Sequence, residues 1–428
     1  AGHGATTGFA SFDAALRLHD PWDTTLYNDV CFEGRKWHLL VDESSLDTLP
    51  HTGRRSTPRY KAKAFQRFPI QLRKVTSKAA ALSAAKAGAC WRPGLSFIAD
   101  LRHAGGPTMG IAHFAKRILR LYGLQQYYTG LHVERVVFPA TSAAHLAHDW
   151  PASMLKLVGH DSATHGGAHL VDAASLLQRR EAACCFEHLV VASRENTYFT
   201  RREDADALRA AAHRLAGVPA AAPTCARPVA CYFQRAEGAP NGKWEGGPRT
   251  VVNAAAVQAA MRAAMPRGQV RVVSANSSHS FVEQVRLFAS CDLLVSVHGS
   301  HNANVMWMRP GAAFMEVNPR KFYYASYHDL ATVAGVLFLQ SRRNEIALAA
   351  DSPLKPKAES FERRFARFDD VRCQESTPCR SQSRSFPTRV NLTDFALEFR
   401  RGVDHVLKGC GGGGRRGRGL GQGGRPRR

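Results

Sequence analysis

The sequence predicts an α/β protein built on doubly wound parallel sheets. In the second half of the chain, short apolar strands and amphipathic helices alternate strictly, which is typical of a parallel sheet with helices on both faces. The first half repeats this alternation less regularly from residue 95 onward. The length of 428 residues and the 44% share of hydrophobic residues suffice for two or three domains with buried cores.

The first half opens with a stretch that carries few signals of regular structure. Residues 1–90 are predicted to be irregular apart from one strand at residues 37–41. A strand at residues 95–99 follows. A helix then begins at Ile111, because apolar residues recur with helical spacing at positions 111, 114, 115, 118, 119 and 122. Further elements are predicted at residues 133–138 and 189–191 (strands) and 203–215 (an alanine-rich helix).

The second half is more regular. Its predicted strands are residues 229–233, 270–273, 293–297, 313–317 and 336–339, and its predicted helices are residues 252–265, 280–289, 301–308, 326–334 and about 393–407. An Ala/Pro stretch that ends near residue 228 marks the boundary between the halves. The chain therefore divides into an irregular region, two Rossmann-like domains, an extension with a closing helix and a disordered Gly/Arg tail, at residues 1–90, 91–222, 229–345, 346–410 and 411–428.

Polar side chains stand at the predicted strand ends of the second domain. Ligands of parallel sheets bind beyond the carboxyl ends of the strands, and this rule selects Arg235, Ser274, His298 and Glu316. After His298, Gly299 turns the chain and Ser300 opens a short helix, whose free N–H groups favour an anion. The pattern predicts a nucleotide-diphosphate site, with Glu316 placed to hold ribose hydroxyls.

The charge of the chain is strongly basic but unevenly distributed. The formal net charge is +23, and six arginines of the tail at 411–428 account for part of it, which leaves +17 for residues 1–410. A basic body favours phosphorylated ligands or polyanions. The Gly/Arg tail is expected to be a disordered appendage, so nucleic-acid binding is not predicted as the main function.

The hydropathy of the chain and its first residues indicate how the protein could be attached to a membrane. No apolar run reaches 18 residues, so no transmembrane helix is predicted. The sequence begins with Ala1 and shows no basic-then-apolar leader. We therefore expect a processed form or fragment, attached to a membrane only through an N-terminal anchor that is missing from this sequence.

Ten cysteines and two glycosylation sequons point to a secretory lumen. Cys373 and Cys379 lie in a polar stretch and are candidates for a small disulfide loop, whereas Cys231 and Cys291 lie in apolar strands and are expected to be free thiols. No CxxC pair is present, so a zinc ribbon is not predicted. The sequons begin at Asn276 and Asn391.

These motifs together resemble glycosyltransferase family 61, which includes xylosyl-, arabinosyl- and O-linked N-acetylglucosaminyltransferases. The likeness covers about residues 184–340, and the first 90 residues show almost none. The matching stretches are Cys185-Phe186, Arg235, Arg249-Thr250-Val251-Val252-Asn253, Ser280-Phe281-Val282-Glu283-Gln284, Asp292-Leu293-Leu294-Val295, His298-Gly299, Asn304, Pro310-Gly311 and Glu316.

The resemblance implies a GT-B fold, in which two Rossmann-like domains face each other, and an inverting, metal-independent transfer from a UDP-sugar. It assigns Arg235 and Arg249 to the donor phosphates, since guanidinium groups bind phosphate in a bidentate manner. His298 would bind donor phosphate or sugar. Asn304 would brace the loop. No metal or further cofactor is expected.

The catalytic base stays open between two residues. Inverting transfer requires a group that takes the proton of the acceptor hydroxyl. His113 stands in the stretch Gly110-Ile111-Ala112-His113-Phe114, which resembles the family's N-terminal motif, but Lys116 and Arg117 occupy positions where an acid is often found. Asp100, at the end of the preceding strand, is the rival. The family also favours small residues where this chain has His301.

Two further motifs do not predict a metal site. Asp204-Ala205-Asp206 spells the Asp-x-Asp of metal-dependent transferases but lies in an Ala/Arg-rich helix, where a solvated face is expected. His160, His165 and His169 lack ligand partners at useful spacing for zinc.

The sequence thus predicts an inverting glycosyltransferase of the Golgi or endoplasmic reticulum lumen, a type II membrane protein when full length. It would pass xylose, arabinose or N-acetylglucosamine from a UDP-sugar to a glycan or glycoprotein. The alternatives are a basic polyanion-binding protein with a degenerate transferase fold and a GT-B enzyme that uses a GDP-sugar.

Overall fold

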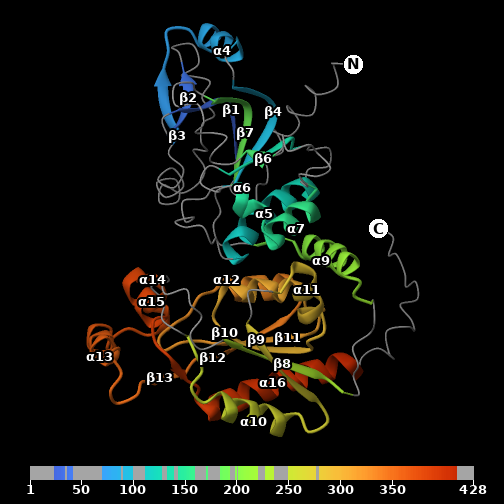
Figure 1. The fold of residues 1–428 in the computed structure, drawn as a ribbon, viewed down its shortest axis with the longest axis vertical. Coiled ribbons are helices and arrows are strands. Elements are labelled where there is room, and N and C mark those ends of the chain that lie inside the picture. The colour runs from blue at the N-terminus through green and yellow to red at the C-terminus, as the bar shows by residue number, and fades with distance from the viewer. Residues whose placement is uncertain are drawn as a thin grey trace, which may run out of the picture. The chain divides into compact units, whose positions relative to one another are not determined.

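The structure is a computed structural model of the chain. It describes residues 24–33, 36–41, 70–87, 90–99, 111–127, 133–138, 143–159, 170–171, 184–192, 198–199, 201–219, 227–235, 249–275 and 279–411. The chain divides into two compact units, residues 1–211 and 212–428, each with its own sheet (Figure 1). Within the described ranges, no helix is both long enough and apolar enough to cross a membrane.

The first unit is built around a seven-stranded mixed sheet. Its spatial order is β3 (Ile70–Lys74), β2 (Lys36–Val41), β1 (Thr24–Glu33), β7 (Cys184–Ala192), β4 (Trp91–Ile98), β5 (Arg135–Val137) and β6 (Leu170–Val171). β1 runs antiparallel to both of its neighbours, and the other pairs are parallel. The helices are α4 (Lys78–Ala87), α5 (Ile111–Tyr127), α6 (Ala143–Leu146), α7 (Asp149–Leu157) and α9 (Arg202–Ala216), the last of which crosses into the second unit.

The N-terminal region differs from its prediction. Residues 1–90 are predicted to hold one strand, yet the structure places β1, β2 and β3 in the sheet and makes that sheet mixed rather than parallel. β1 pairs with the adjacent β2 on one side and with β7, more than 150 residues away, on the other, and no local pattern in the sequence predicts the pairing with β7. Two disulfides join the strands here, Cys31–Cys185 and Cys90–Cys184.

The second unit is a five-stranded parallel sheet in the order β12-β11-β10-β8-β9. The strands are β8 (Val229–Arg235), β9 (Gln269–Ala275), β10 (Leu293–Val297), β11 (Ala313–Val317) and β12 (Leu337–Ser341). Chain order runs outward from β8 in both directions, so the strand order reverses between β8 and β10. Such a switch point is where doubly wound sheets bind ligands.

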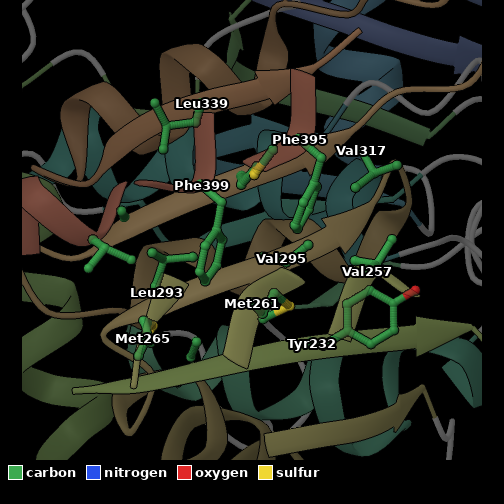
Figure 2. Close-up of a cluster of buried hydrophobic side chains, with 14 of the residues drawn as sticks. Tyr232, Val257, Met261, Met265, Leu293, Val295, Val317, Leu339, Phe395 and Phe399 are labelled. Carbon is green, nitrogen blue, oxygen red and sulfur yellow. The ribbon is translucent and has the colours of Figure 1, made fainter. Parts of the chain in front are cut away.

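Helices cover both faces of this sheet (Figure 1). α10 (Ala254–Ala264) and α16 (Leu392–Gly411) pack on the face that carries Leu293, Val295 and Met315. Phe395 and Phe399 of α16 enter this core (Figure 2). The other face is covered by α11 (Phe281–Ala289), the 3-10 helix η1 (Ser300–Trp307) and α12 (Ser326–Val333). Side chains alternate along a strand, so Ser296, His298 and Glu316 belong to this second face.

A small helical extension follows the sheet. It contains α13 (Lys355–Arg364), α14 (Asp370–Glu375) and α15 (Thr377–Ser383), together with the two-stranded pair β13 (Glu345–Ile346) and β14 (Thr388–Arg389). Phe361, Phe365 and Phe386 form its own small core. The disulfide Cys373–Cys379 ties α14 to α15.

Cys231 and Cys291 correct the expectation of free thiols. They form a disulfide across 60 residues, from the middle of β8 to the residue that precedes β10 by two positions. Both cysteines are fully buried. An apolar strand is thus compatible with a disulfide when the neighbouring strand brings a second cysteine within reach, here with Cα atoms 5.7 Å apart.

Candidate functional site

The strand ends at the switch point bring several predicted site residues together. β10 pairs with β8 up to Ser296 and Phe233, and His298 and Arg235 each lie two residues past this last pair. Ser274, near the end of β9, pairs with Gln234. The side chains of Arg235 and Ser274 lie outside the described part of the structure. With Glu316 paired to Ser296 on the other side of β10, the backbone thus gathers all four predicted strand ends at one edge.

His298 and Glu316 form the centre of the site. The Nδ1 atom of His298 lies 2.7 Å from Oε1 of Glu316, which stands on the adjacent strand β11. The side chain of Glu316 has no exposed surface, and His298 is 6% exposed. A carboxylate so completely buried is not available to a ribose, so we assign Glu316 the positioning of His298 instead of the predicted contact with ribose.

Burial determines the protonation of Glu316. It raises the pKa of this carboxyl from its ordinary value to about 8, against the opposing effects of a hydrogen bond from Asn302 and the charge of Arg249. At neutral pH the carboxyl therefore keeps its proton for most of the time. A protonated carboxyl donates its O–H to Nδ1 and leaves the ring proton of His298 on Nε2.

This raised pKa predicts how folding stability changes with pH. The contribution of Glu316 is fully present below its ordinary pKa and is lost as pH rises through about 8, because the unfolded chain releases the proton first. We expect the melting temperature of the wild type, relative to Glu316→Gln, to fall between about pH 5 and pH 8. Thermal unfolding of both proteins across this range tests it. A constant difference would show that the carboxyl is ionised throughout.

Arg249 holds the turn that carries His298. Its Nη1 donates a hydrogen bond of 2.7 Å to the backbone oxygen of His298. The family resemblance assigns Arg249 to the donor phosphates. The structure places its guanidinium against the turn itself, where its positive charge also favours the ionised form of Glu316. The predicted cation is therefore at the site, in contact with the loop.

The turn itself depends on Gly299 and His301. A Cβ on Gly299 would lie 2.7 Å from the ring of His301, so no larger residue fits without a shift of that ring. The ring of His301 stacks on Phe233 at 4.8 Å, and its Nε2 lies 2.6 Å from Oγ of Ser296. The helix that begins at Ser300 is a 3-10 helix. His301, where the family favours a small residue, is thus packed back onto the sheet.

Asn304 braces the back of the site. It is fully buried, donates to Oε1 of Gln284 at 2.8 Å and accepts a hydrogen bond from Nε1 of Trp307 at 3.0 Å. Gln284 belongs to α11, whose N-terminus is closed by a capping box between Ser280 and Glu283. Asn304 therefore joins η1 to α11, as a bracing residue would.

Aromatic side chains that sequence reasoning missed surround His298. The ring of Phe322 lies 4.4 Å away, Tyr327 5.2 Å and Tyr324 6.0 Å. They come from α12 and from the loop that precedes it, where Phe322-Tyr323-Tyr324 follows the end of β11 by a few residues. An aromatic run directly after a strand end is the signal that could have identified them.

The candidates of the first unit are less defined. His113 lies on α5 with an exposed side chain, whereas Lys116 and Arg120 are buried, with Nζ of Lys116 at 5.3 Å from the ring of Tyr198. These two basic side chains of α5 are therefore packed inside the unit. Asp100, Asn276 and the histidines 160, 165 and 169 lie outside the described residues, as does most of the tail.

Both carboxylates of the Asp-x-Asp sequence form ion pairs with arginines. Asp204 is buried and accepts from Arg201, and Asp206 pairs with Arg209 and lies 3.5 Å from Arg202. Asp204 thus corrects the expectation of a solvated face. Across the described ranges, no group of three His, Cys, Asp or Glu side chains is arranged to hold a metal ion.

The sequon at Asn391 stands at the start of α16. Its side chain is exposed, and Oδ1 accepts the backbone N–H groups of Thr393 and Asp394, which caps the helix. The amide nitrogen, to which a glycan would be attached, takes no part in that cap. The structure thus leaves this sequon on the surface.

Comparison with known proteins identifies the family. The model of the glycosyltransferase 61 family matches residues 38–315, which reach from β2 of the first unit to the strand that carries Glu316. No curated protein matches the chain. The match covers well over half of the sequence and includes the switch point with His298. The chain is therefore a glycosyltransferase and belongs to glycosyltransferase family 61.

Proposed function

We propose that the protein is an inverting glycosyltransferase that takes a sugar from a UDP-sugar and passes it to a glycan or glycoprotein. The observation that carries the proposal is the buried His298–Glu316 pair at the switch point of a parallel sheet. This is where a nucleotide diphosphate binds in doubly wound folds. The surrounding cations and aromatic rings are suited to a diphosphate and a base.

The chemistry assigned to these residues is stabilisation of the leaving group. As the bond between the sugar and the diphosphate breaks, negative charge builds up on the departing phosphate oxygens. His298, with its ring proton held on Nε2 by Glu316, would donate to one of these oxygens. Arg235 would add a guanidinium from the neighbouring strand end. Arg249 would hold the loop and add positive charge. Such a set of donors can act without a metal ion.

The acceptor side is assigned to the first unit. In a GT-B arrangement its sheet would face the second unit and supply the base, His113 or Asp100, that removes the proton from the acceptor hydroxyl. Each unit has a sheet of its own, as this arrangement requires. Substitution of His113 and of Asp100 in turn would identify the base. Loss of the base would lower the rate of sugar transfer and leave binding of the donor unchanged.

The family resemblance supports xylose, arabinose or N-acetylglucosamine as the sugar. Four disulfides among the described residues support folding in an oxidising compartment, here the Golgi or endoplasmic reticulum lumen. The exposed sequon at Asn391 agrees with this location.

Nucleotide binding tests the proposal. Titration calorimetry of the chain with UDP, GDP and CMP, with and without EDTA, should show UDP bound most tightly and EDTA without effect. Preference for GDP would favour a transferase with a GDP-sugar donor. A folded sample that binds none of the three would favour the alternative, a basic protein that holds polyanions on a degenerate transferase fold.

The tail separates these two classes further. The polyanion-binding alternative predicts that removal of residues 411–428, which carry six arginines, reduces heparin affinity and its salt dependence. The enzyme proposal predicts that the same truncation leaves UDP affinity and sugar transfer unchanged.

A further inference from the structure

The C-terminal extension brings an arginine to the candidate site. Arg384 directly follows α15, and the carbon of its guanidinium lies 5.8 Å from the ring centroid of Phe322. Among the residues that the structure describes, this guanidinium takes part in no ion pair or hydrogen bond. The extension lies beyond the part of the chain that the family model matches.

The surroundings of Arg384 add positive charge rather than neutralise it. Arg380 stands one helical turn earlier, with its guanidinium carbon 5.8 Å from the ring of Tyr324, and donates to the backbone oxygen of Gln374. Burial first, and then repulsion by Arg380, lower the pKa of Arg384, whereas Tyr324 and Tyr327 raise it; among the described residues no carboxylate contributes. Burial raises the pKa of Asp370, an acid of the same extension, and the positive charges that lower this pKa belong to Arg342, Arg320 and Lys321.

Arg384 and His298 lie against the same phenyl ring. Phe322 contacts the imidazole of His298 at 4.4 Å and the guanidinium of Arg384 at 5.8 Å. Tyr324 likewise lies near both His298 and Arg380. A partly buried cation without a counterion is costly unless a ligand supplies the negative charge. The arrangement therefore points to an anion held between the extension and the strand ends.

A buried polar side chain nearby also lacks a partner. Asn318 lies one position past the last pair of β10 and β11, beside His298, and is fully buried. Neither its Oδ1 nor its Nδ2 makes a hydrogen bond within the described part of the chain. Buried amides are normally satisfied, so the unpartnered side chain of Asn318 sets these strand ends apart from an ordinary packed core.

We infer that Arg384 binds the phosphate oxygens of the nucleotide-sugar donor, so that the C-terminal extension completes the donor site. The inference rests on the proposed function and adds to it a residue from outside the matched family region. Arginine suits this task because its planar fork binds phosphate through two parallel hydrogen bonds. The ring of Phe322 would hold the fork in place.

Calorimetric titration of the full chain with uridine, UMP and UDP tests this assignment. The variants are Arg384→Gln and Arg384→Lys, with Arg401→Ala as the matched control, since Arg401 is exposed on α16 and pairs with Glu398. Loss of Arg384 should weaken UDP roughly ten- to a hundredfold and leave uridine unchanged. Arg384→Lys should lie between, because it keeps the charge and loses the fork.

The outcomes distinguish failure of the Arg384 assignment from failure of the proposed function. If the wild type binds UDP and Arg384→Gln binds it equally well, the role of Arg384 is overturned and the proposed function stands. Equal weakening of uridine and UDP would indicate a general distortion and also overturn it. A wild type that binds no UDP would overturn both. Melting temperatures of the variants establish that each one is folded.

Discussion

Replacement of His298 by alanine is expected to lower kcat for sugar transfer about 10²–10³-fold, the usual effect of removing one donor that stabilises developing negative charge. The imidazole stands at the switch point, and Glu316 holds it through Nδ1 at 2.7 Å. Three aromatic rings fix its plane. Because the imidazole is already oriented, little free energy is needed to reorganise it during the reaction. The hydrogen bond that it donates therefore contributes fully to kcat.

A second histidine provides the control. His328 lies on α12 within the same part of the chain and is half exposed, with Asp329 as its neighbour. His328→Ala should keep transfer near the wild-type level. Transfer should be measured with saturating UDP-sugar and with the melting temperature of each variant in hand. If His298→Ala is folded and retains full kcat, the leaving group is stabilised elsewhere.

The largest loss of stability is expected for Phe399→Ala. Phe399 is fully buried, lies 5.6 Å from Phe395 in a stacked arrangement, and belongs to the core between α16 and the parallel sheet (Figure 2). Removing a phenyl ring from such a position leaves a cavity and costs about 3–5 kcal/mol of unfolding free energy. Urea denaturation measures this quantity directly.

Leu397 on the same helix is the matched control. Its side chain is 62% exposed, so Leu397→Ala should change the unfolding free energy by less than about 0.5 kcal/mol. The comparison separates burial from helix propensity, since both positions are apolar and lie two residues apart. Equal effects at the two positions would mean that α16 does not pack as described. α16 lies beyond residues 38–315, so a truncated chain limited to the matched region would expose this core.

Local patterns predicted much of the second unit. Strand and helix alternation located all five parallel strands within a few residues, and β10 and β11 match their predicted bounds. The same reasoning selected His298 and Glu316, because a residue that follows or ends an apolar strand must lie at the sheet edge. The strand positions and the two strand-end residues both follow from the short-range periodicity of apolar residues, which can be read in each segment alone.

The sequence by itself therefore determined the parallel sheet and the strand ends at which its polar residues stand, whereas the strand order and its switch point come from the tertiary structure. Only the tertiary structure decided what those residues do there. It pairs β1 with β7, buries Glu316 against His298, joins Cys231 to Cys291, and brings Arg384 to the ring of Phe322. Each of these depends on segments that are distant in the chain. Their contacts follow from packing and burial, which leave no periodic trace in either segment alone.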